Sequence, residues 1–425
     1  MEKNLKSIDK LQLDSINVAK KYLTNCKKKK IDITISPYCD FVTWADGVGR
    51  QNFLNLTKNK DPKKFIISII KELYSIFKIK NFKIYGPKKN LKNNFKLIYT
   101  YCCKSDFDKN GNFYDSLFNQ WSHRTKNTFW FLLSSDNYLP KKNNNLFILY
   151  KSNKRIIFKI FNKILKTFFL KNFFFYLNAT CFTSDFISEK FYQIFKKKIF
   201  ELYIPYENRP HQNAITKIAK KISNKNKIIG YLHPLPWPFQ IDMIYKNKNL
   251  DLLHVCSKIQ KNILYNFFNW PKNKIKIIKS LKYKKLKKRL NYIFLPYEIE
   301  KENFYLDKLA SFFFLEKLDF SKFKISLHPS KSKNFQHKNF KKKIIKKLTS
   351  NLKFKKTNKK NINIILGSPG GVATECLQTN KSVYHITKDP YDIFSPKIWN
   401  MIKIENVYSN IYNYRSYNNK FVLLK

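Results

Sequence analysis

The sequence predicts an α/β protein with two Rossmann-like domains that face a cleft. From residue 179 onward, strand-like and helix-like segments alternate regularly, which favours parallel sheets with helices on both faces. A chain of 425 residues is long enough for two hydrophobic cores. Within 361–386, a buried strand ends in a glycine-rich turn, a helix follows, and a second strand closes a βαβ unit.

The expected elements follow from apolar periodicity, taken in chain order. Helices are expected over 1–30, 64–77, 185–197, 210–222 (with Pro210 in its first turn), 258–268, 302–318, 340–348 and from Val372. Strands are expected over 31–36, 82–85, 96–101, 128–134, 179–183, 200–205, 227–232, 252–256, 274–278, 292–295, 322–327, 361–366 and 382–386.

These elements divide the chain into three parts. We expect an N-terminal Rossmann-like domain over 1–280, with an irregular first 150 residues, and a C-terminal Rossmann-like domain over 285–395. The lysine-rich stretch 279–289 is the expected crossing between them. The tail, 396–425, carries a helical pattern and is expected to pack back on the first domain.

The segment 155–177 is apolar but interrupted by lysines. Lys159, Lys163 and Lys166 fall on one helical face, opposite Phe158, Phe161, Leu165 and Phe168. Such a helix can lie on an anionic membrane surface. The interpretation we favour from the sequence is a helix that packs its apolar face on the protein's own core and leaves a solvated lysine edge.

The formal net charge is +56, and only six of the 84 basic residues are arginine. Nucleic-acid readers favour arginine, so this lysine excess indicates a solvated surface that attracts anionic lipids, glycans or nucleotides rather than a specific nucleic-acid partner. Seven cysteines without a CxxC pair favour a reducing cytoplasm over disulfides or zinc. The N-terminus lacks the apolar core of a signal peptide, and no transmembrane segment is expected.

The glycine-rich turn holds three of the eight glycines, Gly367, Gly370 and Gly371, with Ser368 between them. Glycines at a strand-to-helix turn let a phosphate approach the backbone, and the helix N-terminus offers unpaired N–H groups to it. The same Pro-Gly-Gly segment is also compatible with a plain tight turn. Glu375, in the first turn of the helix, either binds ribose hydroxyls or complements the helix dipole.

Other polar residues follow neighbouring strands. His328, Pro329 and Lys331 come after the strand 322–327, at the rim where a parallel sheet binds ligands. In the first half, Glu207 is the favoured general base and Asp46 its rival, with Arg209 or His233 as anion contacts. Each of these is also a common turn or cap residue. The one Asp-x-Asp pair, Asp106 and Asp108, lies in a polar stretch far from these motifs and indicates a solvated loop, so we expect no metal.

Over about residues 180–390 the order of these motifs resembles GT-B-type glycosyltransferases of bacterial surface-carbohydrate biosynthesis, distantly similar to polysialyltransferases and the Kdo transferases of capsule synthesis. The resemblance rests on the segments 206–210, 230–233, 279–283, 295–297, 327–329 and 368–375. Where related sequences tend to have arginine in the domain crossing, this chain has Lys282.

The resemblance implies transfer of a sugar from a nucleotide-activated donor to a surface glycan or lipid-linked acceptor. It implies that His328, Pro329 and Ser368 hold the nucleotide of the donor. The patterns described above add Lys331, Gly370, Gly371, Thr374 and Glu375 to this expected set, and we expect no cofactor and no metal. Glu207 or Asp46 would activate the acceptor, and His328 would act on the leaving group. The implied location is cytoplasmic, or peripheral at the inner membrane. Glycerol- or ribitol-phosphate transfer and non-catalytic polyanion binding are the alternatives.

Overall fold

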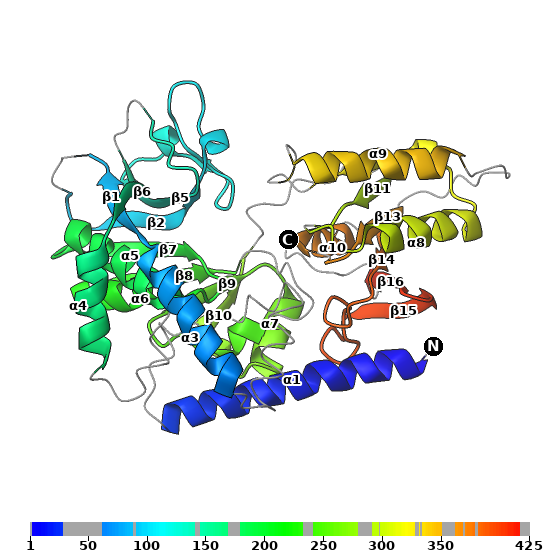
Figure 1. The fold of residues 1–425 in the computed structure, drawn as a ribbon, viewed down its shortest axis with the longest axis horizontal. Coiled ribbons are helices and arrows are strands. Elements are labelled where there is room, and N and C mark those ends of the chain that lie inside the picture. Colours follow the sequence, from blue (N-terminus) through cyan, green and yellow to red (C-terminus); the bar gives the residue numbers. More distant parts are fainter. Residues whose placement is uncertain are drawn as a thin grey trace.

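The protein's α/β class and its parallel sheets are confirmed by a computed structural model (Figure 1). It describes residues 2–28, 62–87, 91–140, 145–168, 179–232, 241–278, 291–296, 298–327, 331, 334–350, 362–368, 370–378 and 381–416. Within these residues the chain forms one eight-stranded sheet, one six-stranded sheet and a small two-stranded sheet.

The eight-stranded sheet has the order β1-β6-β5-β2-β7-β8-β9-β10, and all its pairs are parallel except β1 with β6. Its strands are β1 (Lys80–Tyr85), β2 (Phe95–Cys102), β5 (Thr128–Ser134), β6 (Leu146–Arg155), β7 (Phe200–Pro205), β8 (Lys227–Tyr231), β9 (Leu252–Val255) and β10 (Ile275–Ile277). Because the strands are buried on both sides, the sheet needs a cover on each face.

Helices and an insertion cover the two faces of this sheet. One face contributes to a core with α5 (Ala179–Phe195), α6 (Pro210–Ile222) and α7 (Lys258–Asn266), beside α3 (Pro62–Phe77) and α4 (Ile157–Phe168). The other face packs against the segment between β2 and β5, where Phe113 and Phe118 join Trp130 and Tyr231 in a second cluster. That segment holds the hairpin β3 (Tyr114–Asp115) and β4 (Gln120–Trp121).

The six-stranded sheet has the order β12-β11-β13-β14-β16-β15. Its parallel strands are β11 (Asn291–Phe294), β12 (Phe323–Ser326), β13 (Ile362–Leu366) and β14 (Ser382–Ile386), and the antiparallel pair β15 (Ile402–Tyr408) and β16 (Ile411–Ser416) extends it. One face packs on α8 (Glu302–Leu315) and α9 (Phe335–Ser350). The opposite face carries α10 (Gly370–Gln378), whose buried side chains belong to the core shared with the first sheet.

The helix α1 (Glu2–Lys28) runs beneath both parts of the molecule (Figure 1). It contacts the 3-10 helix at Ile241–Ile244 in the first part. Toward the second part, the amide of the fully buried Gln12 donates to the carbonyl oxygen of Ile393 (2.8 Å), and Asp9 accepts from Ser395 Oγ (2.5 Å). Buried polar side chains with such partners favour one docking geometry, so α1 joins the two sheets. Further 3-10 turns lie at 104–106, 122–124, 272–274 and 320–322.

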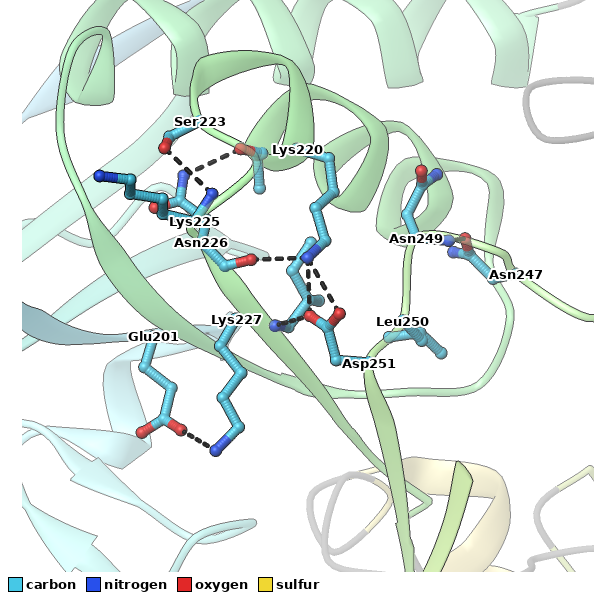
Figure 2. A network of polar contacts seen from close by, with 12 residues as sticks. Glu201, Lys220, Ser223, Lys225, Asn226, Lys227, Asn247, Asn249, Leu250 and Asp251 are labelled. Carbon is cyan, nitrogen blue, oxygen red and sulfur yellow. Dashed lines mark hydrogen bonds and ion pairs between the residues drawn. The ribbon is translucent and has the colours of Figure 1, made fainter. Parts of the chain in front are cut away.

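A polar network fixes the end of α6 to the amino ends of β8 and β9 (Figure 2). Lys220 Nζ lies 2.8 Å and 3.0 Å from the two carboxylate oxygens of Asp251 and donates to the carbonyl oxygen of Asn226 (2.7 Å). The backbone N–H of Ile228 donates to the same carboxylate (2.7 Å). By holding the C-terminal end of α6, this network also sets the position of its N-terminal end on the opposite rim of the sheet.

Three expectations from the sequence are wrong. Residues 179–183 open α5 rather than form a strand, because Phe182 and Phe186 are buried four residues apart, as on one face of a helix. The tail was expected to be helical, but its described residues form the strands β15 and β16, which pair on the edge of the second sheet. The helix α4 exposes its apolar side instead of packing that side on the core, with Phe158 87% exposed.

Other predicted elements are confirmed, among them α1, α3, α6, α7 and the strand–turn–helix–strand unit β13–α10–β14. The strand predicted at 31–36 and the crossing at 279–289 lie outside the described residues.

Candidate functional site

The turn from β13 to α10 is built around Gly367. Its φ of +69° is a conformation that L side chains rarely adopt. A Cβ there would lie 2.7 Å from the hydroxyl oxygen of Tyr305 and 2.9 Å from Pro296 Cβ. Its N–H donates to the carbonyl oxygen of Ile386 (2.9 Å). Both the backbone angle and the lack of space therefore require glycine at this position.

A fully buried histidine supports this turn from inside the sheet. His385 Nε2 lies 2.5 Å from the carbonyl oxygen of Gly367, and its Nδ1 lies 2.8 Å from the hydroxyl of Tyr414. A carbonyl oxygen only accepts, so Nε2 carries the proton and Nδ1 accepts from Tyr414. Burial lowers the pKa of His385 to about 4, against the opposing effect of its bond to Gly367. The ring is therefore neutral at physiological pH.

Two hydroxyl groups at the turn have no hydrogen-bond partner among the described residues. Ser368 Oγ and Thr374 Oγ1 are buried atoms to which no described residue makes a hydrogen bond. Ser368 follows Gly367 directly, and Thr374 lies in α10, whose first N–H groups have no partner within the helix. Buried hydroxyls are normally hydrogen-bonded, which makes these two groups candidate contacts for a bound ligand.

The neighbouring loops of the same rim are tied together by polar contacts. Lys331 Nζ lies 2.9 Å from Glu298 Oε1, which joins the loop after β12 to the segment after β11. His337, buried in the first turn of α9, places Nε2 3.1 Å from the carbonyl oxygen of Pro296. Burial, with the carboxylates of Asp392, Asp389 and Glu300, raises the pKa of Tyr305 beside Gly367. The rim is thus preorganised around the β13–α10 turn.

The first sheet has a comparable turn between β7 and α6. Arg209 Nε lies 3.4 Å from Glu207 Oε2, and both side chains are about one third exposed, at 29% and 30%. Between them Asn208 has a φ of +62°, a region in which asparagine is enriched. Glu207 is therefore presented to solvent at the carboxyl end of β7, next to one cationic neighbour.

Buried amides hold the β7–α6 turn in place. Gln212 Oε1 accepts from the backbone N–H groups of Glu207 (2.9 Å) and Arg209 (3.1 Å), while its Nε2 donates to the carbonyl oxygen of Pro205 (2.6 Å). Beneath it, the fully buried Tyr206 hydroxyl donates to Asn213 Oδ1 (2.8 Å). With both flanks bonded, the orientation of Glu207 is set by the scaffold rather than by a mobile loop.

His211, in the first turn of α6, joins this turn to β2. Its Nδ1 lies 2.8 Å from the hydroxyl of Tyr99, and its Nε2 lies 2.9 Å from that of Tyr101. Burial, together with the charge of Arg209, lowers the pKa of His211 to about 3. A neutral histidine between two phenols can relay a proton. No role for His211 could be predicted from the sequence, because its partners Tyr99 and Tyr101 lie over a hundred residues away along the chain.

Some of the predicted site residues lie within the described residues and others do not. It places Ser368, Gly370, Gly371, Thr374 and Glu375 on one turn and helix, Lys331 on the same rim, and Glu207 on the other sheet. Asp46, His233, His328 and Pro329 lie outside the described residues, and so does the placement of the Glu375 side chain.

The Asp-x-Asp pair and a cavity of the first part lie away from these two turns. Asp106 accepts from the N–H of Cys103 (2.8 Å) and Asp108 from that of Asn112 (2.8 Å), so both carboxylates close local turns. Within the described ranges no group of three or more His, Cys, Asp or Glu side chains is placed to hold a metal. A cavity of about 260 Å³ near Gly86, Phe147 and Lys198 lies at the amino ends of β2 and β6, opposite the carboxyl rim.

No protein-family model and no curated protein sequence matches this chain. Among solved structures, it is similar to one described as accessory secretory protein 1, 2 and 3 in Streptococcus pneumoniae, with 13% identity and a TM-score of 0.28. That similarity covers 51% of this chain and 46% of the other, so the chain spans less than half the length of that relative. It is also similar to a glycosyltransferase from Rickettsia africae ESF-5, with 12% identity over 72% of this chain and 87% of the other and a TM-score of 0.33.

Proposed function

We propose that the protein is a glycosyltransferase that moves a sugar from a nucleotide-activated donor to a surface glycan or lipid-linked acceptor. The observation that carries this proposal is the β13–α10 turn. It combines an obligatory glycine, the free N–H groups of a helix N-terminus and two buried hydroxyls without described partners. Such a set suits the phosphate of a nucleotide-sugar, and the two domains would then form a GT-B-like cleft.

In this proposal the donor phosphate lies against the N–H groups after Gly370, with Ser368 as a hydroxyl donor. Lys331 adds positive charge at the same rim, tempered by its contact with Glu298. His328 and Pro329 would complete the nucleotide site, as the sequence resemblance implies. These donors would stabilise the negative charge that develops on the leaving phosphate as the bond to the sugar breaks.

The acceptor would be activated at the other turn. Glu207 takes the proton from an acceptor hydroxyl, whose oxygen then forms the bond to the sugar carbon as the nucleotide leaves with its bonding electrons. Arg209 Nε lies 3.4 Å from the Glu207 carboxylate and places a positive charge beside it. Asp46 remains the rival base. The proposal includes no metal and a cytoplasmic location.

The competing function is non-catalytic binding of polyanions, which the net charge of +56 favours. The two functions differ in how they respond to nucleotides and salt. The test is thermal stabilisation of the purified protein by CMP, CDP, UDP and GDP at moderate salt. A nucleotide at one hundred times its dissociation constant should add about 2.7 kcal/mol to the unfolding free energy.

Saturable stabilisation by one nucleotide, lost in a His328→Ala variant that still folds, supports the transferase. If only longer polyanions stabilise the protein, and salt abolishes the effect, the proposed transfer is wrong. Glycerol- or ribitol-phosphate transfer would be distinguished by the acceptor product, which would gain a phosphodiester-linked polyol instead of a glycosidically linked sugar.

A further inference from the structure

The helix α4 exposes an apolar stripe on its outer side. Phe158, Phe161 and Leu165 are 87%, 54% and 46% exposed, and their spacing of three and four residues places them on one face. The opposite side of α4 packs on the protein core, because Ile160 is fully buried and Lys163 forms an ion pair with Asp185 of α5. The stripe is therefore exposed because a different face of α4 packs on the core.

The neighbouring helix α3, which contacts α4, adds a second stripe. Ile67, Ile70 and Tyr74 are 52%, 61% and 63% exposed, again three and four residues apart, and Phe77 follows at 37%. Together with Ile157, eight of the fifteen exposed large apolar side chains in the described residues lie on these two helices. A concentration of this kind marks an interaction surface rather than scattered exposure.

The charges around these stripes are positive. Exposed lysines accompany them, Lys159 and Lys166 on α4 and Lys71 and Lys78 on α3. The helix α4 contains no acidic residue, and the one acid of α3, Glu72, accepts from the backbone N–H of Ala179 (3.2 Å). Asp185 is paired with Lys163. An apolar face whose neighbouring charges on α3 and α4 are mainly lysines matches the interface of an anionic bilayer, where phenyl rings enter the acyl boundary and ammonium groups meet phosphates.

We propose that the α3–α4 surface docks the protein peripherally on a membrane containing anionic lipid. A second copy of the chain fits less well, because a symmetric interface would bring the two sets of lysines together. Among the described residues no helix has the length and hydropathy of a membrane span. The inference does not rest on the proposed transfer reaction.

The experiment is flotation of the full chain with phosphatidylcholine vesicles, with and without phosphatidylglycerol. Phe158→Ser/Phe161→Ser/Leu165→Ser should lower partitioning onto anionic vesicles by about tenfold or more, since three side chains lose their burial in lipid. Lys159→Gln/Lys166→Gln should lower it by a similar factor at low salt and less at high salt. Lys163 is left unchanged because it pairs with Asp185.

Matched controls separate this surface from the general charge of the protein. Phe314→Ser/Phe335→Ser removes two phenyl rings that are 62% and 81% exposed on the second part. Lys338→Gln/Lys342→Gln removes the same charge from exposed positions of α9. Both should leave partitioning nearly unchanged. Equal partitioning of the α4 variants and these controls would overturn the proposal. It would also be overturned if the wild-type protein does not bind vesicles and light scattering shows that it dimerises through α4.

Discussion

His385 Nε2 donates to the carbonyl oxygen of Gly367 at a distance of 2.5 Å, and this hydrogen bond joins the strand β14 to the turn that begins α10. The ring is fully buried, and Tyr414 of β16 donates to its other nitrogen. Three strands of the second sheet thus fix the backbone of one glycine. If this turn binds the donor as proposed, His385 would act as a positioning residue that does not itself touch the donor.

Two histidines with lowered pKa values, His385 and His211, predict acid sensitivity. The pKa of His385 falls from the ordinary 6.5 to about 4, and that of His211 to about 3. Between those values and 6.5 the unfolded chain binds more protons, so the free energy of unfolding should fall as pH drops below about 6.5. Each histidine contributes a slope of at most about 1.4 kcal/mol per pH unit. Urea denaturation at a series of pH values measures this slope.

The His385→Gln variant gives the control for this prediction, because glutamine can still donate to Gly367 but does not titrate. Its slope between pH of about 4 and 6.5 should be smaller than that of the wild type, whatever its stability at neutral pH. An unchanged slope would show that His385 is not the group responsible.

The α/β class could be predicted because strand and helix periods differ and alternate clearly from β7 to β14. The sequence failed where tertiary contacts overrode local pattern. Residues 402–416 have a helical pattern, yet Tyr412 and Tyr414 are buried against the core as parts of β16. For α4 the helical period was predicted correctly, but the face that packs on the core was not. A periodic pattern does not say which face is buried; the contacts of Ile160 and Lys163 determine the buried face.

The candidate site was predictable in its backbone and less so in its side chains. Because glycine is scarce in this chain, its cluster at 367–371 predicted a special turn. The structure explains Gly367 by its positive φ and by the lack of space for a Cβ. His385, His211 and Gln212 were missed because their roles depend on partners from other strands, such as Tyr414 and Tyr99. No periodic pattern encodes such long-range pairs.

The network of Figure 2 predicts unequal effects for two neighbouring ion pairs. Asp251 accepts from Lys220 and from the backbone N–H of Ile228, so Asp251→Ala should lower the unfolding free energy by about 1–3 kcal/mol. Lys227 pairs with Glu201 over 3.1 Å at a more exposed position, so Lys227→Gln should cost less than about 1 kcal/mol. Equal costs from denaturant melts would contradict this ranking.

Glu207→Gln tests the proposed base. The amide keeps the size of the side chain but cannot take a proton, so transfer should fall by about a hundredfold or more while melting temperature and nucleotide binding stay nearly constant. Glu201→Gln, at the amino end of the same strand, is the matched control and should retain activity. If Glu207→Gln remains active, Asp46 becomes the base to test.

Two glycines of the same turn should respond differently to alanine. Gly367→Ala meets Tyr305 and Pro296 in a left-handed conformation, so the apo protein should lose about 1–3 kcal/mol of stability whatever ligand is present. Gly371 lies in the first turn of α10, where a Cβ would obstruct a phosphate approaching the N–H groups. Losing a charge-assisted bond costs about 1.5–3 kcal/mol, so Gly371→Ala should weaken the preferred nucleotide by about tenfold or more, with modest loss of apo stability.

Calorimetric titration and apo melting curves of both variants separate obstruction from strain. Lower affinity with a nearly constant apo melting temperature in Gly371→Ala assigns the N–H groups of α10 to the donor phosphate. A lower apo melting temperature in Gly367→Ala alone is the expected companion result. A folded Gly371→Ala protein that binds the nucleotide normally would remove this turn from the donor site and leave it a structural connection between β13 and α10.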